Sequence, residues 1–412
     1  MSRGPLDGLS VVDFSQIRAG PWCTQLLGEL GAEVVKVERP GSGARERTGG
    51  PRQNGVGANH LARNRNKRSV AIDLKSDAGR ELARDLVSGA DVVVENFGPG
   101  TMERLGLGYD DLAEVNGDLV YASIKAYGED GPQADRKGVD LIVQAEGGIM
   151  SVTGPEGGPP VKLGQALGDI GTGLYATIGI LSALYDRERG GGVRDDADGG
   201  AEGEDARTGQ KVSTDLFGTV VSFMEEYLTI YGMTGEDPEP LGRRHQTVVP
   251  YEVAETKDGH VAFAILGGDE EWERFATEVL EAPALLEFDS RADRLDRYDE
   301  IAEVMHPILR ERTTEEWRTI FDDYGYPNGP LNSVSDVVGH PQALAQGAVL
   351  EHEHPVAGDV LVHGHPLRFS DAETGTRSGA PALGEHTDAV LGARLGLDDE
   401  EIASLRDEGV VE

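Results

Sequence analysis

The strongest constraint on the fold is an alternation of strand and helix patterns over the first 125 residues. Leu9–Phe14 is a short apolar run, Pro21–Leu30 has helical spacing, and Glu33–Glu38 alternates around three valines. These patterns predict a strand, a helix and a second strand. Units of this kind build a parallel sheet, because two parallel strands need a long crossover between them.

The alternation continues with strands predicted at Ser69–Leu74, Asp91–Glu95 and Leu119–Lys125, and a helix at Asp77–Ser88. We therefore predict an α/β fold in which residues 1–215 form a large domain around a doubly wound, Rossmann-like parallel sheet. Ligands bind such sheets at the carboxyl ends of the strands.

A smaller α+β domain is predicted at 225–335, and 336–412 is predicted to return to the large domain. The patterns that predict the smaller domain are a helix at Thr219–Tyr231, a strand pair at Tyr251–Glu255 and His260–Ile265, and a capping box from Thr313 to Glu316. Residues 190–209 are acidic, glycine-rich and without apolar periodicity, and we interpret them as a mobile insertion.

One carboxylate has an unusual setting. Asp169 lies among the glycines of Gln165–Tyr175 (Gln-Ala-Leu-Gly-Asp-Ile-Gly-Thr-Gly-Leu-Tyr), directly before the apolar helix pattern Leu174–Leu184. From these residues alone two interpretations are open. Aspartate is a favoured helix N-cap, and a rigidly held carboxylate that a substrate can approach closely can also act as a nucleophile.

Composition excludes several classes of function. Seventy-four acidic against 38 basic residues give a net charge of −36, which repels phosphate backbones and anionic lipids, so we expect no nucleic-acid and no membrane partner. No apolar run is long enough to span a bilayer and no signal-peptide pattern opens the chain, so we expect a cytoplasmic protein. The high acidity and scarce lysine are typical of halophilic proteins, in which dense counterions screen the carboxylates.

Glu38 ends the second strand where a ribose-binding acid would lie in a dinucleotide-binding dehydrogenase. The first loop excludes that class. Its sequence, Ser15-Gln16-Ile17-Arg18-Ala19-Gly20, lacks the Gly-x-Gly-x-x-Gly fingerprint, and no Walker-type Gly-Lys-Ser/Thr is present.

Basic residues nevertheless gather in the first third of the chain. They indicate either a small polyanionic ligand that carries phosphates or salt bridges to the surrounding carboxylates. The cluster comprises Arg39, Arg45, Arg47, Arg52, Arg63, Arg65, Lys67 and Arg68, followed by Arg104, Lys125 and Lys137.

Two other features are given structural interpretations. His352, His354, His363 and His365 form two His-x-His pairs that could share a metal on paired strands, but no cysteine or outer-shell pattern accompanies them, so we predict exposed hairpin histidines and no metal. Cys23 is expected to be buried and inert.

Several blocks of the chain, taken in order, resemble class III CoA-transferases, the family of formyl-CoA transferase and the carnitine-type CoA-transferases. The blocks are Pro5-Leu6-Asp7-Gly8, Ala19-Gly20-Pro21, Asn66-Lys67-Arg68-Ser69, Val94-Glu95-Asn96-Phe97-Gly98-Pro99-Gly100 and Gly168-Asp169. The resemblance implies that Asp169 attacks an acyl-CoA thioester, without a metal or other cofactor. It also implies an interlocked homodimer in which each chain has a large and a small domain, with the active site between them.

The resemblance further implies a set of CoA contacts, in which cations hold the phosphates and the backbone at Asn96 and Phe97 holds adenine. The implied residues are Ile17, Arg18, Arg39, Ile72, Asn96, Phe97, Arg104, Lys125, Lys137 and Asp140.

Departures from the family pattern bear on the substrate. Gln16-Ile17-Arg18 replaces the His-Val-Gln of formyl-CoA transferase and Val139 replaces a tyrosine, which argues against an oxalate-sized pocket. Related α-methylacyl-CoA racemases have a histidine at the position of Val139. Racemisation needs two titratable groups on opposite faces of a carbon, so the absence of this histidine disfavours a racemase.

We expect succinyl-CoA as the donor and a small dicarboxylate such as mesaconate as the acceptor, which a halophile using a methylaspartate cycle would need to activate. The residues expected at the substrate carboxylate are Arg18, Arg243, Arg244, His245, Gly267 and Gly268. Arg243 and Arg244 could instead only neutralise nearby acids. The alternatives are a racemase, a transferase for monocarboxylates such as formate or for oxalate or carnitine derivatives, and a non-catalytic CoA-binding protein.

Overall fold

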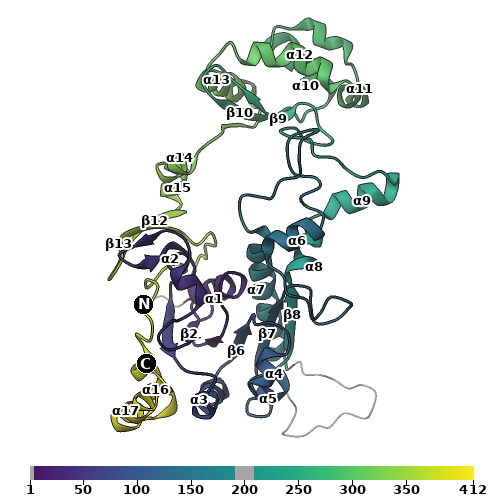
Figure 1. Ribbon diagram of the computed structural model, residues 1–412. Helices are drawn as coiled ribbons and strands as arrows, with labels where there is room; N and C mark the ends of the chain where they lie inside the picture. Colours follow the sequence, from purple (N-terminus) through teal and green to yellow (C-terminus); the bar gives the residue numbers. More distant parts are fainter. Residues whose placement is uncertain (1–3, 191–207) are drawn as a thin grey trace. The chain divides into compact units, whose positions relative to one another are not determined.

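The computed structural model describes residues 4–190 and 208–412, so the predicted acidic insertion at 190–209 lies outside the described residues except at its ends. The chain divides into two compact units (Figure 1). The first comprises Met1–Ile149, Leu163–Leu228 and Pro341–Glu412, and the second comprises Met150–Lys162 and Thr229–His340. Residues 150–162 thus belong to the second unit, although they lie within the range 1–215 assigned above to the large domain.

Six parallel strands form the sheet of the first unit, in the spatial order β5-β2-β1-β6-β7-β8. Their bounds are Ser10–Asp13 (β1), Glu33–Glu38 (β2), Lys67–Ala71 (β5), Val92–Glu95 (β6), Val120–Lys125 (β7) and Lys211–Asp215 (β8). The predicted parallel-sheet α/β fold is confirmed. Because the strand order reverses between β1 and β6, their carboxyl ends form the place where such sheets bind ligands.

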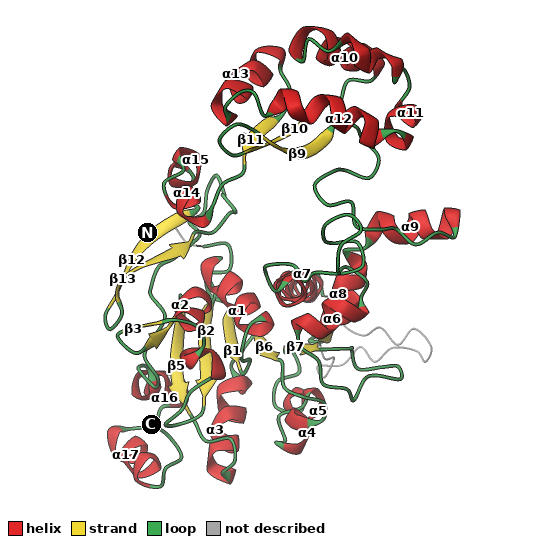
Figure 2. Ribbon diagram, turned by 45° about the horizontal axis from the view of Figure 1, so that its top comes forward, coloured by secondary structure: helices red, strands yellow, loops and turns green. Residues whose placement is uncertain are grey.

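Helices cover both faces of this sheet (Figure 2), which explains why its central strands are continuous valine runs. Helices α1 (Ala19–Glu29) and α7 (Leu167–Glu188) pack on one face. The opposite face carries the main apolar core. That core is built by α3 (Asp77–Ser88), α4 (Thr101–Arg104), α5 (Tyr109–Ala113), α16 (Thr387–Leu395) and α17 (Asp399–Asp407).

Pro341–Glu412 returns to the first unit. It forms the hairpin of β12 (Val349–His354) and β13 (Gly358–His363), and its last residues cover the edge strand, where Val411 bridges to Ile72. Shorter elements complete the unit: η1 (Arg45–Thr48), β3 (Arg52–Gln53), β4 (Val56–Gly57), α2 (Ala58–Arg63), α6 (Asp140–Glu146), α8 (Leu216–Ser222) and α15 (Pro341–Ala345).

The second unit has its own core around an antiparallel sheet in the order β11-β10-β9. Trp317 is fully buried there and stacks on Phe321, whose ring stacks on Phe263. The predicted capping box from Thr313 to Glu316 is confirmed. Its elements are β9 (Tyr251–Glu255), β10 (His260–Ala264), α10 (Asp269–Arg274), η2 (Phe275–Val279), η3 (Pro283–Glu287), α11 (Arg291–Asp296), α12 (Tyr298–Leu309), α13 (Thr314–Tyr324), β11 (Asn328–Pro330) and α14 (Val334–Val338).

Two helix predictions differ from the structure. The helix predicted at Leu174–Leu184 is the longer α7, which begins seven residues earlier at Leu167. The helix predicted at Thr219–Tyr231 is two helices, α8 and α9 (Glu225–Thr234), and the boundary between the two units falls within α9. Among the described residues only α7 has the length and composition to cross a membrane, and half of that stretch is buried inside the fold, as in the core helix of a globular protein.

Candidate active site

The first loop of the sheet and the loop after β6 are joined across the point where the strand order reverses. The Asn96 side chain accepts a hydrogen bond from the Gln16 amide at 2.8 Å and donates one to the Gln16 carbonyl at 2.7 Å. Ile17 has a left-handed backbone, with φ of 71°, a conformation rare for a β-branched residue. The Glu46 carboxylate holds it by accepting a hydrogen bond from the Ile17 amide at 2.8 Å. The first loop is therefore a fixed surface.

A buried charge network lies beneath that loop. Lys36 donates to the Ser15 carbonyl at 2.8 Å and pairs with Glu46 at 3.1 Å. Lys67 pairs with Asp13 at 3.0 Å. These groups are almost completely buried, and each charge has an opposite partner, as buried charges require. The network therefore fixes the backbone position of Ile17 and Arg18.

The residues predicted to hold CoA follow the carboxyl ends of the strands. Arg39 follows β2, Ile72 follows β5, and Asn96 and Phe97 follow β6. Arg39 is exposed, whereas Ile72 is buried in the core, so only its backbone is available to a ligand.

The three remaining predicted cations differ in their partners. The Lys125 ammonium pairs with Glu95 at 2.6 Å and donates to the Phe97 carbonyl at 3.1 Å. Arg104 is exposed and donates to Thr101 at 3.0 Å, and Lys137 lies exposed in the loop before α6. Lys125 is therefore engaged by the protein itself.

Asp169 lies in the first turn of α7, but it is not the cap of that helix. The N-cap position is Ala166, which has no capping side chain, so the capping interpretation of Asp169 is wrong. Asp140, at the start of α6, caps α7 instead. Its Oδ1 accepts hydrogen bonds from the amides of Gly168 at 2.9 Å and Asp169 at 3.4 Å, and its Oδ2 accepts one from Gln144 at 2.6 Å.

The glycines around Asp169 allow close packing of α7. A Cβ at Gly168 would lie 3.1 Å from Asp140 Oδ1, and one at Gly171 would lie 2.5 Å from the Phe223 ring. A Cβ at Gly173 would lie 2.7 Å from the carbonyl oxygen of Ala19, the first residue of α1. The Gly-Asp-Ile-Gly-Thr-Gly sequence thus brings α6, α8 and the start of α1 up to the turn that carries Asp169.

The half-buried Asp169 carboxylate has a pKa raised to about 6. Burial is the largest cause and the Asp140 charge is the second, while Arg18, Arg63 and a hydrogen bond from the Ala19 amide oppose them. The carboxylate therefore lies at the amino ends of two helices, α7 and α1, which favour negative charge. It is mostly ionised at neutral pH and partly shielded from water, as an attacking carboxylate requires.

Arg63, the last residue of α2, was missed as a site residue. It appeared only as one member of the basic cluster, yet the structure brings it close enough to Asp169 for each charge to act on the other. Burial, followed by the Arg18 charge, lowers the pKa of Arg63 to about 10. No local pattern marks it, because a short helix and a loop place it beside the nucleophile.

The remaining predicted substrate residues belong to the second unit. Arg244 pairs with Glu156 at 2.5 Å and lies over the Tyr298 ring. Its ion-pair partner is therefore not one of the acids that lie close to it in the sequence. His245 stacks on Tyr251, with ring centroids 4.7 Å apart. Arg243 is exposed, as are Gly267 and Gly268, which lie between β10 and α10.

The C-terminal histidines correct one prediction. His354 and His365 are only 3% and 4% exposed, because His354 bonds the Ala380 carbonyl and His365 bonds Glu29, each at 2.9 Å. His365 thus ties the C-terminal segment to α1, and His354 ties the hairpin to the loop that follows it. In the described part of the chain no group of three or more His, Cys, Asp or Glu residues is arranged to hold a metal. Cys23 is fully buried, and burial raises the pKa of its thiol to about 12, so it is inert as predicted.

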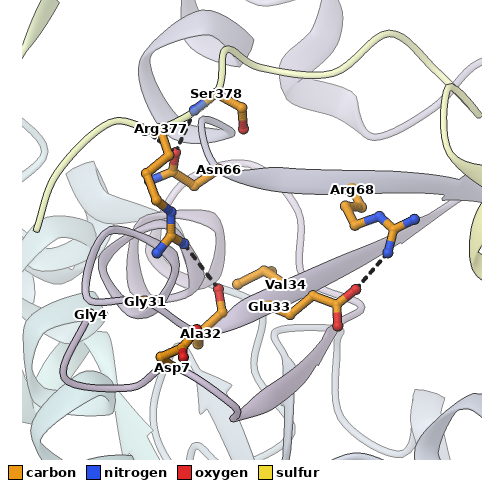
Figure 3. A pocket seen from close by; sticks show the side chains of 10 residues that line it. All are labelled: Gly4, Asp7, Gly31, Ala32, Glu33, Val34, Asn66, Arg68, Arg377 and Ser378. Atoms are coloured by element: carbon orange, nitrogen blue, oxygen red, sulfur yellow. Dashed lines mark hydrogen bonds and ion pairs between the residues drawn. The ribbon is translucent and has the colours of Figure 1, made fainter. Parts of the chain in front are cut away.

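A cavity of about 610 Å³ lies at the amino ends of β2 and β5, the opposite end of these strands from the site (Figure 3). Both of its arginines are engaged by the protein itself. Arg68 pairs with Glu33 at 2.6 Å, and Arg377 donates to the carbonyl oxygen of Gly28 at 2.6 Å. The cavity is therefore separate from the group around Asp169.

Comparison with known proteins gives one consistent answer. The model of CoA-transferase family III matches residues 6–387. An acyl-CoA transferase of Fusarium pseudograminearum is 37% identical over 100% of this chain and 89% of its own length. The human succinyl-CoA:glutarate CoA-transferase is 34% identical (99% and 90%), and the succinyl-CoA:mesaconate CoA-transferase of Haloarcula marismortui is 36% identical (94% and 96%).

Among solved structures, a CAIB/BAIF family protein from Brucella suis matches with a TM-score of 0.82 and 34% identity. The match covers 96% of this chain and 100% of that one.

Proposed function

Since this chain belongs to CoA-transferase family III and is a CoA-transferase, we propose that it moves CoA from succinyl-CoA to a small dicarboxylic acid such as mesaconate, with Asp169 as the nucleophile. The observation that carries the proposal is the setting of Asp169, a half-buried carboxylate at two helix amino ends beside Arg18 and Arg63. Relatives that use succinyl-CoA with mesaconate or glutarate support the choice of substrates.

The chemistry needs no general base. An Asp169 oxygen attacks the thioester carbonyl, the C–S bond breaks, and CoA leaves as the thiolate with the electron pair, which yields a mixed anhydride. The thiolate then attacks the aspartyl carbonyl and releases the donor acid as a carboxylate. The acceptor carboxylate attacks the resulting aspartyl-CoA thioester, and thiolate attack on the acceptor carbonyl of the new anhydride regenerates Asp169. Charge and atoms balance without ATP, a metal or another cofactor.

The surroundings of Asp169 suit each step. The Ala19 amide and the amino end of α7 face the carboxylate and would stabilise the oxyanions that form on attack. Asp140 fixes the first turn of α7, so the nucleophile keeps its orientation through four attacks. The residues after β2, β5 and β6 would hold CoA, with Arg39, Arg104 and Lys137 available to its phosphates.

The alternative functions differ in the residues that they require. A racemase needs a second base, and Val139, at the N-cap of α6, supplies none. A CoA-binding protein without catalysis would tolerate loss of Asp169.

The decisive experiment is Asp169→Ala, with Asp186→Asn as the matched control because Asp186 is an exposed aspartate near the other end of the same helix. We expect Asp169→Ala to abolish transfer while CoA still binds, and Asp186→Asn to keep it. Incubation of the unmodified protein with acyl-CoA and hydroxylamine should place a hydroxamate on Asp169, as detected by peptide mass spectrometry. Substantial transfer by Asp169→Ala would refute the nucleophile.

A panel of acyl-CoA donors and free acids, read by mass spectrometry, tests the substrates. If monocarboxylates such as butyrate outperformed every diacid, the dicarboxylate assignment would fail and the transferase would stand. The role of Arg243, Arg244, His245, Gly267 and Gly268 at the substrate carboxylate stays a proposal from the sequence, in which Arg244 would have to exchange its Glu156 partner for the substrate. The interlocked homodimer is proposed from the family resemblance. Sedimentation analysis at several protein concentrations tests the dimer.

A further inference from the structure

Arg63 differs from the other buried cations of the first unit. It is only 9% exposed, yet among the described residues it forms no ion pair. Its guanidinium reaches only the Ile17 carbonyl and two oxygens of Asn59, all at the long distance of 3.4 Å. By contrast, Lys36, Lys67 and Arg65 pair with Glu46 at 3.1 Å, Asp13 at 3.0 Å and Glu29 at 2.8 Å.

A buried guanidinium with five donors and no carboxylate bonded to it is costly to the fold, because its lost hydration is not fully replaced. The protein retains that cost next to its nucleophile. Arg18, beside it, also makes no side-chain hydrogen bond within the described part of the chain, and the two positive charges act on each other. Both cations are therefore available to an anion that is not part of the protein.

The position of Arg63 relative to Asp169 defines what that anion can be. Arg63 contacts the first loop at the Ile17 carbonyl, and Asp169 contacts the same loop at the Ala19 amide. Both groups therefore approach the same short stretch of the first loop, Ile17–Ala19. A four- or five-carbon diacid is the kind of anion that could be bonded to Asp169 at one end and reach the arginine with the other.

We propose that Arg63, assisted by Arg18, binds the distal carboxylate of the acid while its proximal carboxyl is joined to Asp169, and so makes this transferase selective for dicarboxylates. The inference rests on the proposed function and names the residue that carries its substrate choice. A fork of guanidinium donors matches a carboxylate at two points. A monocarboxylate of equal length would leave the buried cation unpaired and would bring an alkyl end against it.

The test compares succinate with butyrate as acceptors, because the two acids have the same chain length and differ in the distal carboxylate. In Arg63→Gln, kcat/KM for succinate should fall about 10- to 100-fold, the range expected for a lost hydrogen bond to a charged group, while kcat/KM for butyrate is unchanged or higher. Arg63→Lys, which keeps the charge without the fork, should fall between. Arg52→Gln, an exposed arginine of the neighbouring β3, is the control and should leave both values unchanged.

A second measurement needs no variant. Succinamate replaces the distal carboxylate of succinate with a neutral amide of the same shape, and the unmodified enzyme should use it about 10- to 100-fold less well. Equal use of succinate and succinamate, or an equal loss for succinate and butyrate in Arg63→Gln, would overturn the assignment. Absence of transfer from any acyl-CoA to any acid in the unmodified protein would instead overturn the proposed function.

Discussion

The charge of Asp140 should raise the pH below which the enzyme loses activity. Asp140 accepts hydrogen bonds from two amides in the first turn of α7 and is the second largest cause of the raised pKa of Asp169. Asp140→Asn keeps an oxygen toward those amides and removes the charge. We therefore expect the acid limb of kcat/KM, which reports ionisations of the free enzyme, to move to lower pH.

The size of the shift follows from the pKa of Asp169. The rise from 3.8 to about 6 is due first to burial, which Asp140→Asn leaves unchanged. We assign about one pKa unit, or about 1.4 kcal/mol, to the nearby like charge. At pH 5 a carboxyl group of pKa 6 is about one tenth ionised and one of pKa 5 about half, so relative activity at pH 5 should rise about fivefold.

The assay is transfer from succinyl-CoA at limiting substrate between pH 4.5 and 8, with each variant scaled to its own plateau. In Asp140→Asn the new amide nitrogen faces Gln144 Nε2, so the hydrogen bond between them is lost as well. Gln144→Met is the control, because it removes the same bond and keeps the charge of Asp140; it also removes the bonds of Gln144 to the Leu163 amide and the Gln165 carbonyl, so it is the harsher of the two changes to the hydrogen bonding. An acid limb that does not move in Asp140→Asn, or that moves equally in Gln144→Met, would show that the charge of Asp140 does not tune Asp169.

Two further predictions concern stability. The net charge of −36 should make folding depend on salt, because the Debye length shrinks from about 10 Å at 0.1 M to about 3 Å at 1 M; equal melting temperatures in dilute buffer and in concentrated potassium chloride would contradict this. Gly173→Ala should lower the free energy of unfolding by about 1 to 3 kcal/mol and reduce kcat/KM, because its Cβ would lie 2.7 Å from the Ala19 carbonyl and displace the start of α1. Gly232→Ala in α9, where a Cβ meets nothing within 4 Å, should be nearly neutral in denaturant melts.

The central strands could be predicted from the sequence because both of their faces are buried. Glu33–Glu38 coincides with β2, and the other predicted strands overlap β1, β5, β6 and β7. The sixth strand was missed. β8 lies at the sheet edge and alternates polar residues such as Lys211, Ser213 and Asp215, so it has no apolar run to detect.

The site was predictable only where a residue can be recognised from its own local sequence. Asp169 was identified by its glycines and by family resemblance. The capping role of Asp140 was not, because it acts across 28 residues of chain. The same holds for His365, whose carboxylate partner Glu29 lies 336 residues away. Long-range pairs of this kind follow from the tertiary arrangement, which local spacing does not encode.

The buried network under the first loop requires lysine rather than arginine. Arginine outnumbers lysine in the sequence, and of its eight lysines two, Lys36 and Lys67, are completely enclosed. Lys67 directs its three ammonium protons to Asp13 at 3.0 Å, the Pro21 carbonyl at 2.9 Å and Asn64 at 3.1 Å. A flat guanidinium cannot supply that tetrahedral geometry. Replacement of Lys67 by arginine would therefore leave part of this hydrogen bonding unmet, whereas an exposed lysine can be exchanged for arginine without such a loss.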